Sequence, residues 1–126
     1  MKRTISTDDA PDAVGPYSQA TTNGDLLFTA GQVALTPDGE ALDDAPVEEQ
    51  ARQALDNLAA ILESEGCSMD DVLKTTVFLA DMDDYGAVNE VYAEYFEGDP
   101  PARSAVAVDE LPVGFDVEME VVADAA

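Results

Sequence analysis

Two segments of the chain repeat apolar residues every three to four positions, which is the spacing of an amphipathic helix. The first lies over residues 46–66 and the second over residues 84–97. Asp44 or a neighbour is suited to cap the first helix, and Glu48–Glu49 complement the positive end of its dipole. Gly66 is suited to end it, because glycine adopts the left-handed backbone of a helix end.

Shorter apolar runs predict strands. The pair Asn23-Gly24 predicts a two-residue hairpin turn, since both of its positions need positive φ, and Pro37-Asp38-Gly39 predicts another reversal. The predicted order is β-β-β-α-β-α-β-β, which is an α+β pattern with both helices on one face of the sheet, in a single domain over residues 1–126. The predicted strands cover residues 2–7, 17–22, 25–31, 72–80, 102–108 and 115–123.

The charge of the chain is strongly acidic, with 28 Asp and Glu against five Lys and Arg and a formal net charge of −23. A hydrophobic content of 46% and clear periodicity favour a folded domain with an acidic surface over a disordered chain. Because the acidic residues are spread along the whole chain, we interpret them as adaptation to a salt-rich, halophilic cytoplasm. Binding to nucleic acid or to an anionic membrane surface needs clustered Lys and Arg, and the few basic residues here are scattered. We therefore expect neither as a partner.

The chain has one cysteine, Cys67, and no histidine. This composition excludes an intrachain disulfide, a histidine-dependent catalytic triad and a His–Cys metal site. Cys67 is predicted to be a small buried side chain, because no histidine is present to activate it. No stretch of 18 apolar residues exists, and acidic residues follow the basic start at Lys2-Arg3 where a signal peptide needs an apolar core. We therefore expect a cytoplasmic protein.

Arg103 is the first candidate for binding chemistry. Strand alternation places it on one face with Ala105 and Ala107, and these small side chains leave room for a ligand. The planar guanidinium fork fits a carboxylate bidentately. The alternative is a surface arginine paired with one of the many acidic side chains, and the spacing alone does not separate the two.

Three other residues have both a structural and a functional interpretation. Alternation puts Glu118 on a face with Asp116 and Glu120, which favours a solvated acidic face; the functional alternative is a general base for a water molecule. Asn89 lies on the apolar stripe of the second helix, where its amide needs a partner. Tyr17 is either a core aromatic residue or the wall of a pocket.

Along nearly its whole length the chain resembles the Rid family of reactive-intermediate deaminases, also called YjgF-like or RidA-like. No single motif is decisive, but four occur in the right order and spacing in a chain of the right length. They are Ala13-Val14-Gly15-Pro16-Tyr17-Ser18-Gln19-Ala20, Leu27-Phe28-Thr29-Ala30-Gly31-Gln32, Val72–Leu79 with Asp81-Met82, and Pro101–Val106 with Val117–Glu120.

The resemblance implies a chorismate-mutase-like fold with a mixed six-stranded sheet, assembled as a homotrimer with active sites between subunits. It implies an enzyme, a hydrolase of C=N bonds that converts 2-iminobutanoate and 2-iminopropanoate, or their enamine tautomers, to 2-oxo acids and ammonia. These reactive intermediates come from pyridoxal-phosphate-dependent dehydratases, and the deaminase itself uses no cofactor or metal. By matching position, Arg103 would bind the substrate carboxylate and Glu118 would activate the water. Tyr17 and Asn89 would line the pocket, and the Gly31 backbone would contact the reactive end.

The chain departs from the family pattern at two positions. Ala30 stands where many relatives have serine, and Ala105 stands at a substrate-pocket position where many imine deaminases have cysteine. Two rival functions remain: a non-catalytic trimer that binds a small carboxylate metabolite, and an RNA-cleaving protein. The acidic charge and the absence of histidine argue against the second rival.

Overall fold

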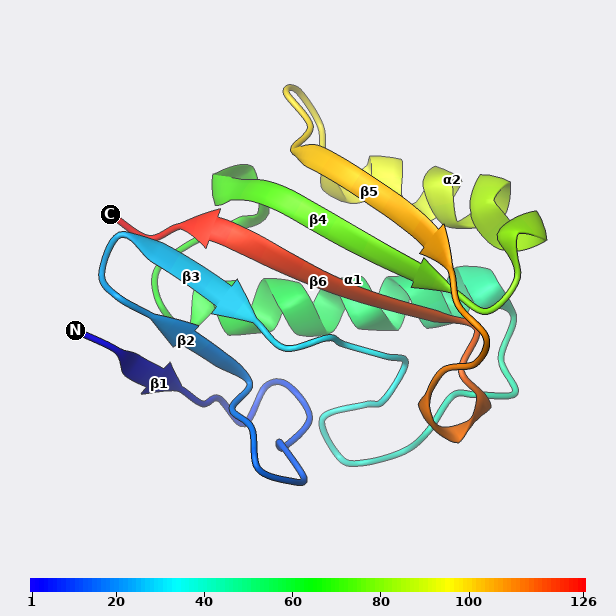
Figure 1. Ribbon diagram of the computed structural model, residues 1–126, viewed down its shortest axis with the longest axis horizontal. Helices are drawn as coiled ribbons and strands as arrows, with labels where there is room; N and C mark the ends of the chain where they lie inside the picture. The colour runs from blue at the N-terminus through cyan, green and yellow to red at the C-terminus, as the bar shows by residue number, and fades with distance from the viewer.

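The computed structural model describes residues 1–126 and shows one twisted sheet with both helices on the same face (Figure 1). Single 3₁₀ turns precede β4, α2 and β6, over Met69–Asp71, Met82–Asp84 and Pro112–Gly114. The longer elements are β1 (Arg3–Ile5), β2 (Ala20–Thr22), β3 (Leu26–Thr29), α1 (Val47–Glu63), β4 (Val72–Leu79), α2 (Tyr85–Tyr95), β5 (Ala102–Ala107) and β6 (Val117–Asp124).

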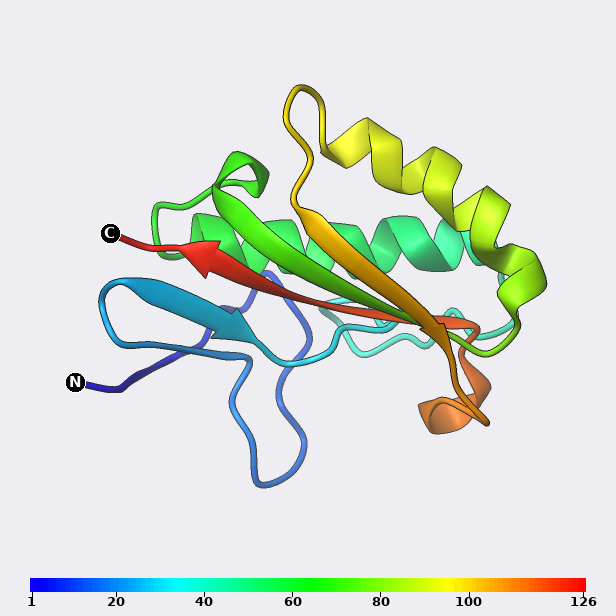
Figure 2. The ribbon, with the colours of Figure 1, turned by 45° about the horizontal axis from the view of Figure 1, so that its top comes forward.

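The sheet is mixed and its strands follow the order β1-β2-β3-β6-β4-β5. Only β4 and β5 pair in parallel, and α2 is the crossover between them. The helix α1 lies against β6 and α2, and no helix covers the opposite face, which we call the open face (Figure 2). The α+β class, the six strands and the shared helix face predicted from the sequence are confirmed. Neither helix is long and apolar enough to cross a membrane.

The core lies between the sheet and the helices. Along β6 the side chains of Val117, Met119 and Val121 are buried against the helices, whereas Glu118 and Glu120 are half-buried on the open face. The buried stripe of α1 includes four large side chains, and each contributes about 1.5–3 kcal/mol by leaving water. These side chains are Leu55, Leu58, Ile61 and Leu62.

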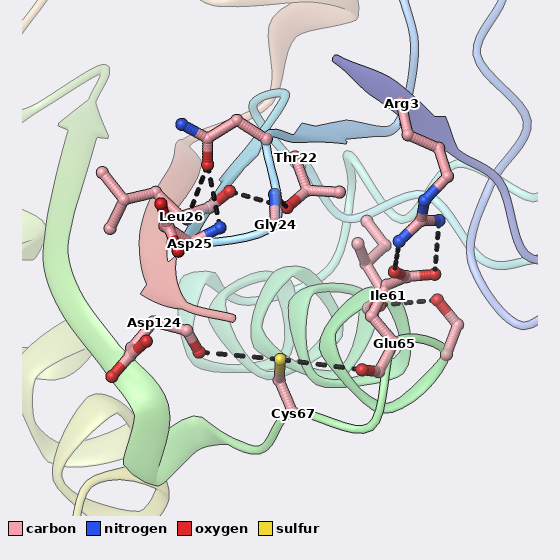
Figure 3. A network of polar contacts seen from close by, with 11 residues as sticks. Arg3, Thr22, Gly24, Asp25, Leu26, Ile61, Glu65, Cys67 and Asp124 are labelled. Atoms are coloured by element: carbon pink, nitrogen blue, oxygen red, sulfur yellow. Dashed lines mark hydrogen bonds and ion pairs between the residues drawn. The ribbon is translucent and has the colours of Figure 1, made fainter. Parts of the chain in front are cut away.

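The hairpin between β2 and β3 is confirmed, but its turn differs from the predicted one. Only Gly24 has positive φ, at 96°, and Asn23 does not. The Asn23 carboxamide oxygen instead accepts hydrogen bonds from the backbone N–H groups of Asp25 and Leu26, at 3.0 and 2.9 Å (Figure 3). The side chain thus holds a three-residue loop over residues 23–25 in place of the predicted two-residue turn.

The start of α1 also differs from the prediction. Asp44 does not cap the helix; Pro46 occupies the N-cap, and no side chain caps that end. The fully buried Gln50 instead donates to two carbonyls that precede the helix and to the Asp116 carboxylate, and it accepts from the Asp116 N–H at 2.9 Å. Asp116 is therefore turned toward α1, and the prediction that it shares a face with Glu118 is wrong.

Cys67 is buried in the core, as predicted for a small filling side chain. Its thiol makes only long contacts, to the carbonyls of Asp124 and Glu65 at 3.7 and 3.9 Å (Figure 3). Burial, reinforced by the neighbouring acidic side chains, raises the pKa of the thiol. A thiol held in its protonated form is a poor nucleophile.

Candidate active site

Arg103 lies on β5, the edge strand, and its side chain faces α2. Its pairing with Thr75 of β4 places it on the helix side of the sheet. The guanidinium carbon stands 4.7 Å from the centre of the Tyr92 ring and 5.4 Å from that of Tyr85. One terminal nitrogen, Nη2, donates a hydrogen bond of 2.8 Å to the Tyr85 hydroxyl. Arg103 is therefore held by α2 through aromatic side chains.

No acidic side chain pairs with Arg103, although the chain contains 28 of them. The two ion pairs of the molecule are Arg3–Glu65 and Arg52–Glu94. The interpretation of Arg103 as a surface arginine bound to an acid is wrong for this chain. Its positive charge remains open to a groove lined by Asn89, Tyr92, Ala93, Phe96, Pro100 and Pro101.

Asn89 and Tyr85 lie one helical turn apart and face the same side as Tyr92. Asn89 first, and Arg103 second, lower the pKa of the Tyr85 hydroxyl, because both stabilise its phenolate. In the sequence, Tyr85 and Tyr92 fall at the apolar spacing of the second predicted helix, and the pattern did not mark them as site residues. Tyr85, Asn89 and Tyr92 have the i, i+4, i+7 spacing of one helix face, which was the signal in the sequence that they lie together. Their contact with Arg103 depends on the sheet register, which that spacing does not contain.

Ala105 packs against the core and does not line the groove.

Glu118 lies on β6 and points to the open face, where it is half-buried. Burial, and then the neighbouring Glu120, raise the pKa of its carboxyl. A carbon atom added to Gly31 would stand 2.8 Å from the Glu118 carboxyl carbon and oxygen. Glycine at position 31 therefore makes the space that the carboxyl group occupies.

Tyr17 lines a pocket together with Gly31, Gln19 and Gln32. Tyr17 is 53% exposed, so it is a pocket wall and not a core residue. Gly31 connects Tyr17 with Glu118, because it lines the pocket with Tyr17 and also approaches the Glu118 carboxyl group. No three acidic or thiol side chains converge closely enough to hold a metal ion.

The candidate residues thus form two clusters. The arginine cluster contains Arg103, Asn89, Tyr85 and Tyr92 and lies on the helix side of the sheet. The glutamate cluster contains Glu118, whose side chain points to the open face, together with Gly31 and Tyr17, which share a pocket. Strand β4 separates the strands that carry Arg103 and Glu118, so the two residues are two strand spacings, about 10 Å, apart across the sheet. Their partners on β4, Thr75 and Phe78, also lie three residues apart along that strand. A single small ligand cannot contact both charged groups within one protomer.

Replacement of Gly31 by alanine tests the fit between Gly31 and Glu118. The added methyl group should displace the flexible end of Glu118 rather than unfold the chain, because Gly31 does not have positive φ. If Glu118 must be placed within about 0.5 Å for the imine hydrolysis that the resemblance implies, we expect the rate of that reaction to fall at least tenfold. The melting temperature should change little. Gly24→Ala is the opposite control: nothing crowds that site, but its φ of 96° should make the variant less stable without a direct effect on the site.

Known proteins of one family are similar to this chain over nearly its whole length. The family model described as Endoribonuclease L-PSP matches residues 7–125. A 2-iminobutanoate/2-iminopropanoate deaminase of Mus musculus is 49% identical over 98% of this chain and 91% of its own length. A RutC family protein of Pyrococcus horikoshii is 47% identical over 98% of both chains. The solved structure of a Rid family protein of unknown function from Yersinia pestis has a TM-score of 0.95 at 42% identity, and covers 98% of this chain and 99% of its own.

Proposed function

The chain belongs to the Endoribonuclease L-PSP family, the Rid or YjgF-like family, and from that premise we propose that it hydrolyses 2-iminobutanoate and 2-iminopropanoate. The products are the corresponding 2-oxo acids and ammonia. The related mouse protein carries the name of this activity. The observation that carries the proposal is Arg103, a cation without an acidic partner beside a groove in a chain of net charge −23.

The chemistry of imine hydrolysis suits these residue types. When the nitrogen of an imine is protonated, its carbon is already electrophilic. Attack by water therefore needs neither a protein nucleophile nor an activated thiol. The carboxylate of the substrate matches the Arg103 fork, which fixes the position of the reacting carbon. A Glu118 carboxylate can take a proton from the attacking water and return it to the leaving ammonia, and its raised pKa brings it closer to the working pH.

Both charged groups can act on one substrate only if a second copy of the chain supplies one of the clusters. We therefore propose a homotrimer in which the arginine cluster of one subunit meets the glutamate cluster of the next. Three such heterologous contacts close into a ring and give three equal sites. Enclosure between subunits would also exclude water and strengthen the field of Glu118 on the imine.

A coupled assay tests the activity. A threonine dehydratase generates 2-iminobutanoate, semicarbazide traps it, and the protein should suppress the trapped product while it speeds formation of 2-oxobutanoate. Light scattering in concentrated potassium chloride should give the mass of three chains. A trimer that binds 2-oxobutanoate but leaves the trapping rate unchanged would instead identify the non-catalytic binder.

We also propose that the acidic surface adapts the protein to high salt. Self-repulsion at a net charge of −23 weakens as the Debye length falls from about 10 Å at 0.1 M salt to about 3 Å at 1 M. We expect the melting temperature to rise between about 0.1 M and 2 M potassium chloride, more than it does for a relative of near-zero charge. A melting temperature that stays flat over this range would contradict the adaptation.

Replacement of Asp84 gives a local test of the same repulsion between acidic side chains, again through the melting temperature. Its pKa is raised by burial first and by Asp116, Asp81, Asp83 and Glu48 next. Since the fold favours its protonated form, its ionisation destabilises the protein as pH rises above the ordinary pKa of aspartate. Asp84→Asn should therefore raise the melting temperature at neutral pH and low salt, and the gain should shrink in high salt.

A further inference from the structure

Two tyrosines of α2, and no carboxylate, hold the Arg103 guanidinium. We propose that Tyr85 and Tyr92 are positioning residues: they form a neutral seat that orients Arg103 and keeps its fork free for the carboxylate of a ligand. The inference rests on the carboxylate-binding role proposed for Arg103. It adds how that role is preserved in a chain with 28 acidic side chains.

Tyr92 is the fixed part of the seat. Its side chain is buried, and its hydroxyl lies 3.0 Å from the Thr75 hydroxyl in a buried hydrogen bond. The Phe96 ring packs against it at a centroid distance of 4.5 Å. Because both ends of the Tyr92 side chain are held, its ring offers Arg103 a face whose position does not change. A guanidinium stacked over an aromatic face is attracted to it without losing its charge.

Tyr85 sets the direction of the fork. Its oxygen accepts from Nη2 of Arg103 and so occupies one of the five N–H donors of the guanidinium. The stack on Tyr92 limits the tilt of the guanidinium plane, and the hydrogen bond to Tyr85 limits rotation within that plane. Four N–H groups remain for a ligand in a defined orientation. The ordering of this long side chain then precedes binding and does not oppose it.

The neutrality of the seat is as important as its shape. A glutamate or aspartate in the place of Tyr85 could also orient Arg103, but it would occupy the fork and cancel the charge. The acidic residue of α2 that does bind an arginine, Glu94, pairs with Arg52 of α1 and not with Arg103. The seat therefore separates Arg103 from the acidic surface around it.

Calorimetric binding of 2-oxobutanoate, a stable 2-oxo acid, tests the seat. Tyr85→Phe keeps the ring and removes the acceptor, and we expect it to weaken binding about two- to tenfold, the cost of ordering one long side chain. In the imine assay the same variant should raise KM and leave kcat nearly unchanged, because Tyr85 acts only on the carboxylate end. Tyr85→Glu should abolish binding, since its carboxylate competes for the fork.

Tyr95→Phe is the matched control, because it also removes a tyrosine hydroxyl from α2. The Tyr95 hydroxyl bonds to Asp56 and to the Arg52 carbonyl, and not to Arg103. It should bind 2-oxobutanoate like the wild type. Tyr85→Phe and Tyr85→Glu proteins that both bind as tightly as the wild type would overturn the inference, as would a wild type that binds no 2-oxobutanoate. Tyr85-dependent binding in a protein that hydrolyses no imine would keep the inference and refute the proposed activity.

Discussion

Arg103→Ala is expected to lower kcat/KM for imine hydrolysis about a hundredfold or more, because two hydrogen bonds between charged groups are lost at the substrate carboxylate. The fold should survive, since the Arg103 side chain makes no ion pair and its only hydrogen bond is to the exposed Tyr85. Arg103→Lys should recover little of the loss, because an ammonium group offers a point charge in place of the planar fork. Steady-state kinetics in the coupled assay and a thermal melt check both statements.

Arg52→Ala is the control for this prediction. It also removes an arginine that contacts α2, but its partner is Glu94 on the surface. Exposed pairs of this kind contribute about 0–1 kcal/mol, so activity should change little. An Arg103→Ala protein with turnover close to that of the wild type would exclude the carboxylate-binding role.

Glu118→Gln is expected to lower kcat about 10²- to 10⁴-fold, the range for loss of a general base. The amide keeps the shape of the side chain beside Gly31 but cannot accept a proton from water. Binding of 2-oxobutanoate and assembly should remain. Because the fold raises the pKa of Glu118, its ionisation reduces stability as pH rises above the ordinary glutamate value. The neutral glutamine should therefore leave the melting temperature at neutral pH unchanged or higher.

Glu120→Gln separates a catalytic role of Glu118 from a general effect of acidic charge. Glu120 lies two residues along on the same face and is the second cause of the raised pKa of Glu118. Its replacement should keep turnover at neutral pH and move the acid limb of the pH profile to lower pH. Equal losses of turnover in both variants would remove the reason to assign the base to Glu118.

The fold was predictable to the extent that it depends on local pattern. Alternation along residues 115–123 separated Glu118 from the buried Met119, and helical spacing located α1 and α2 to within a few residues. The errors arose where a side chain bonds to the backbone or to a distant element. Asn23 stabilises its own loop, and Gln50 binds Asp116 across 66 residues.

The candidate site was predictable residue by residue but not as an arrangement. Pattern alone marked Arg103, Asn89 and Tyr17 as candidates without separating a functional from a structural role, and for Glu118 it favoured a solvated acidic face. That Arg103 and Glu118 lie on opposite faces depends on the parallel register of β4 with β5 and the antiparallel register of β4 with β6. Those pairings join segments far apart in the sequence, so no local pattern contains them. The seat of Arg103 on Tyr85 and Tyr92 went unpredicted for the same reason.

Subunit mixing between Arg103→Ala and Glu118→Gln proteins tests most directly that one site is built from two copies. Each variant alone should be inactive, whereas their unfolding and reassociation in equal amounts should restore about a quarter of the wild-type activity, because random assembly of a cyclic oligomer pairs an intact Arg103 with an intact Glu118 at one site in four. Hybrid oligomers that form, as shown by light scattering and a mass tag on one variant, yet remain inactive would contradict the account.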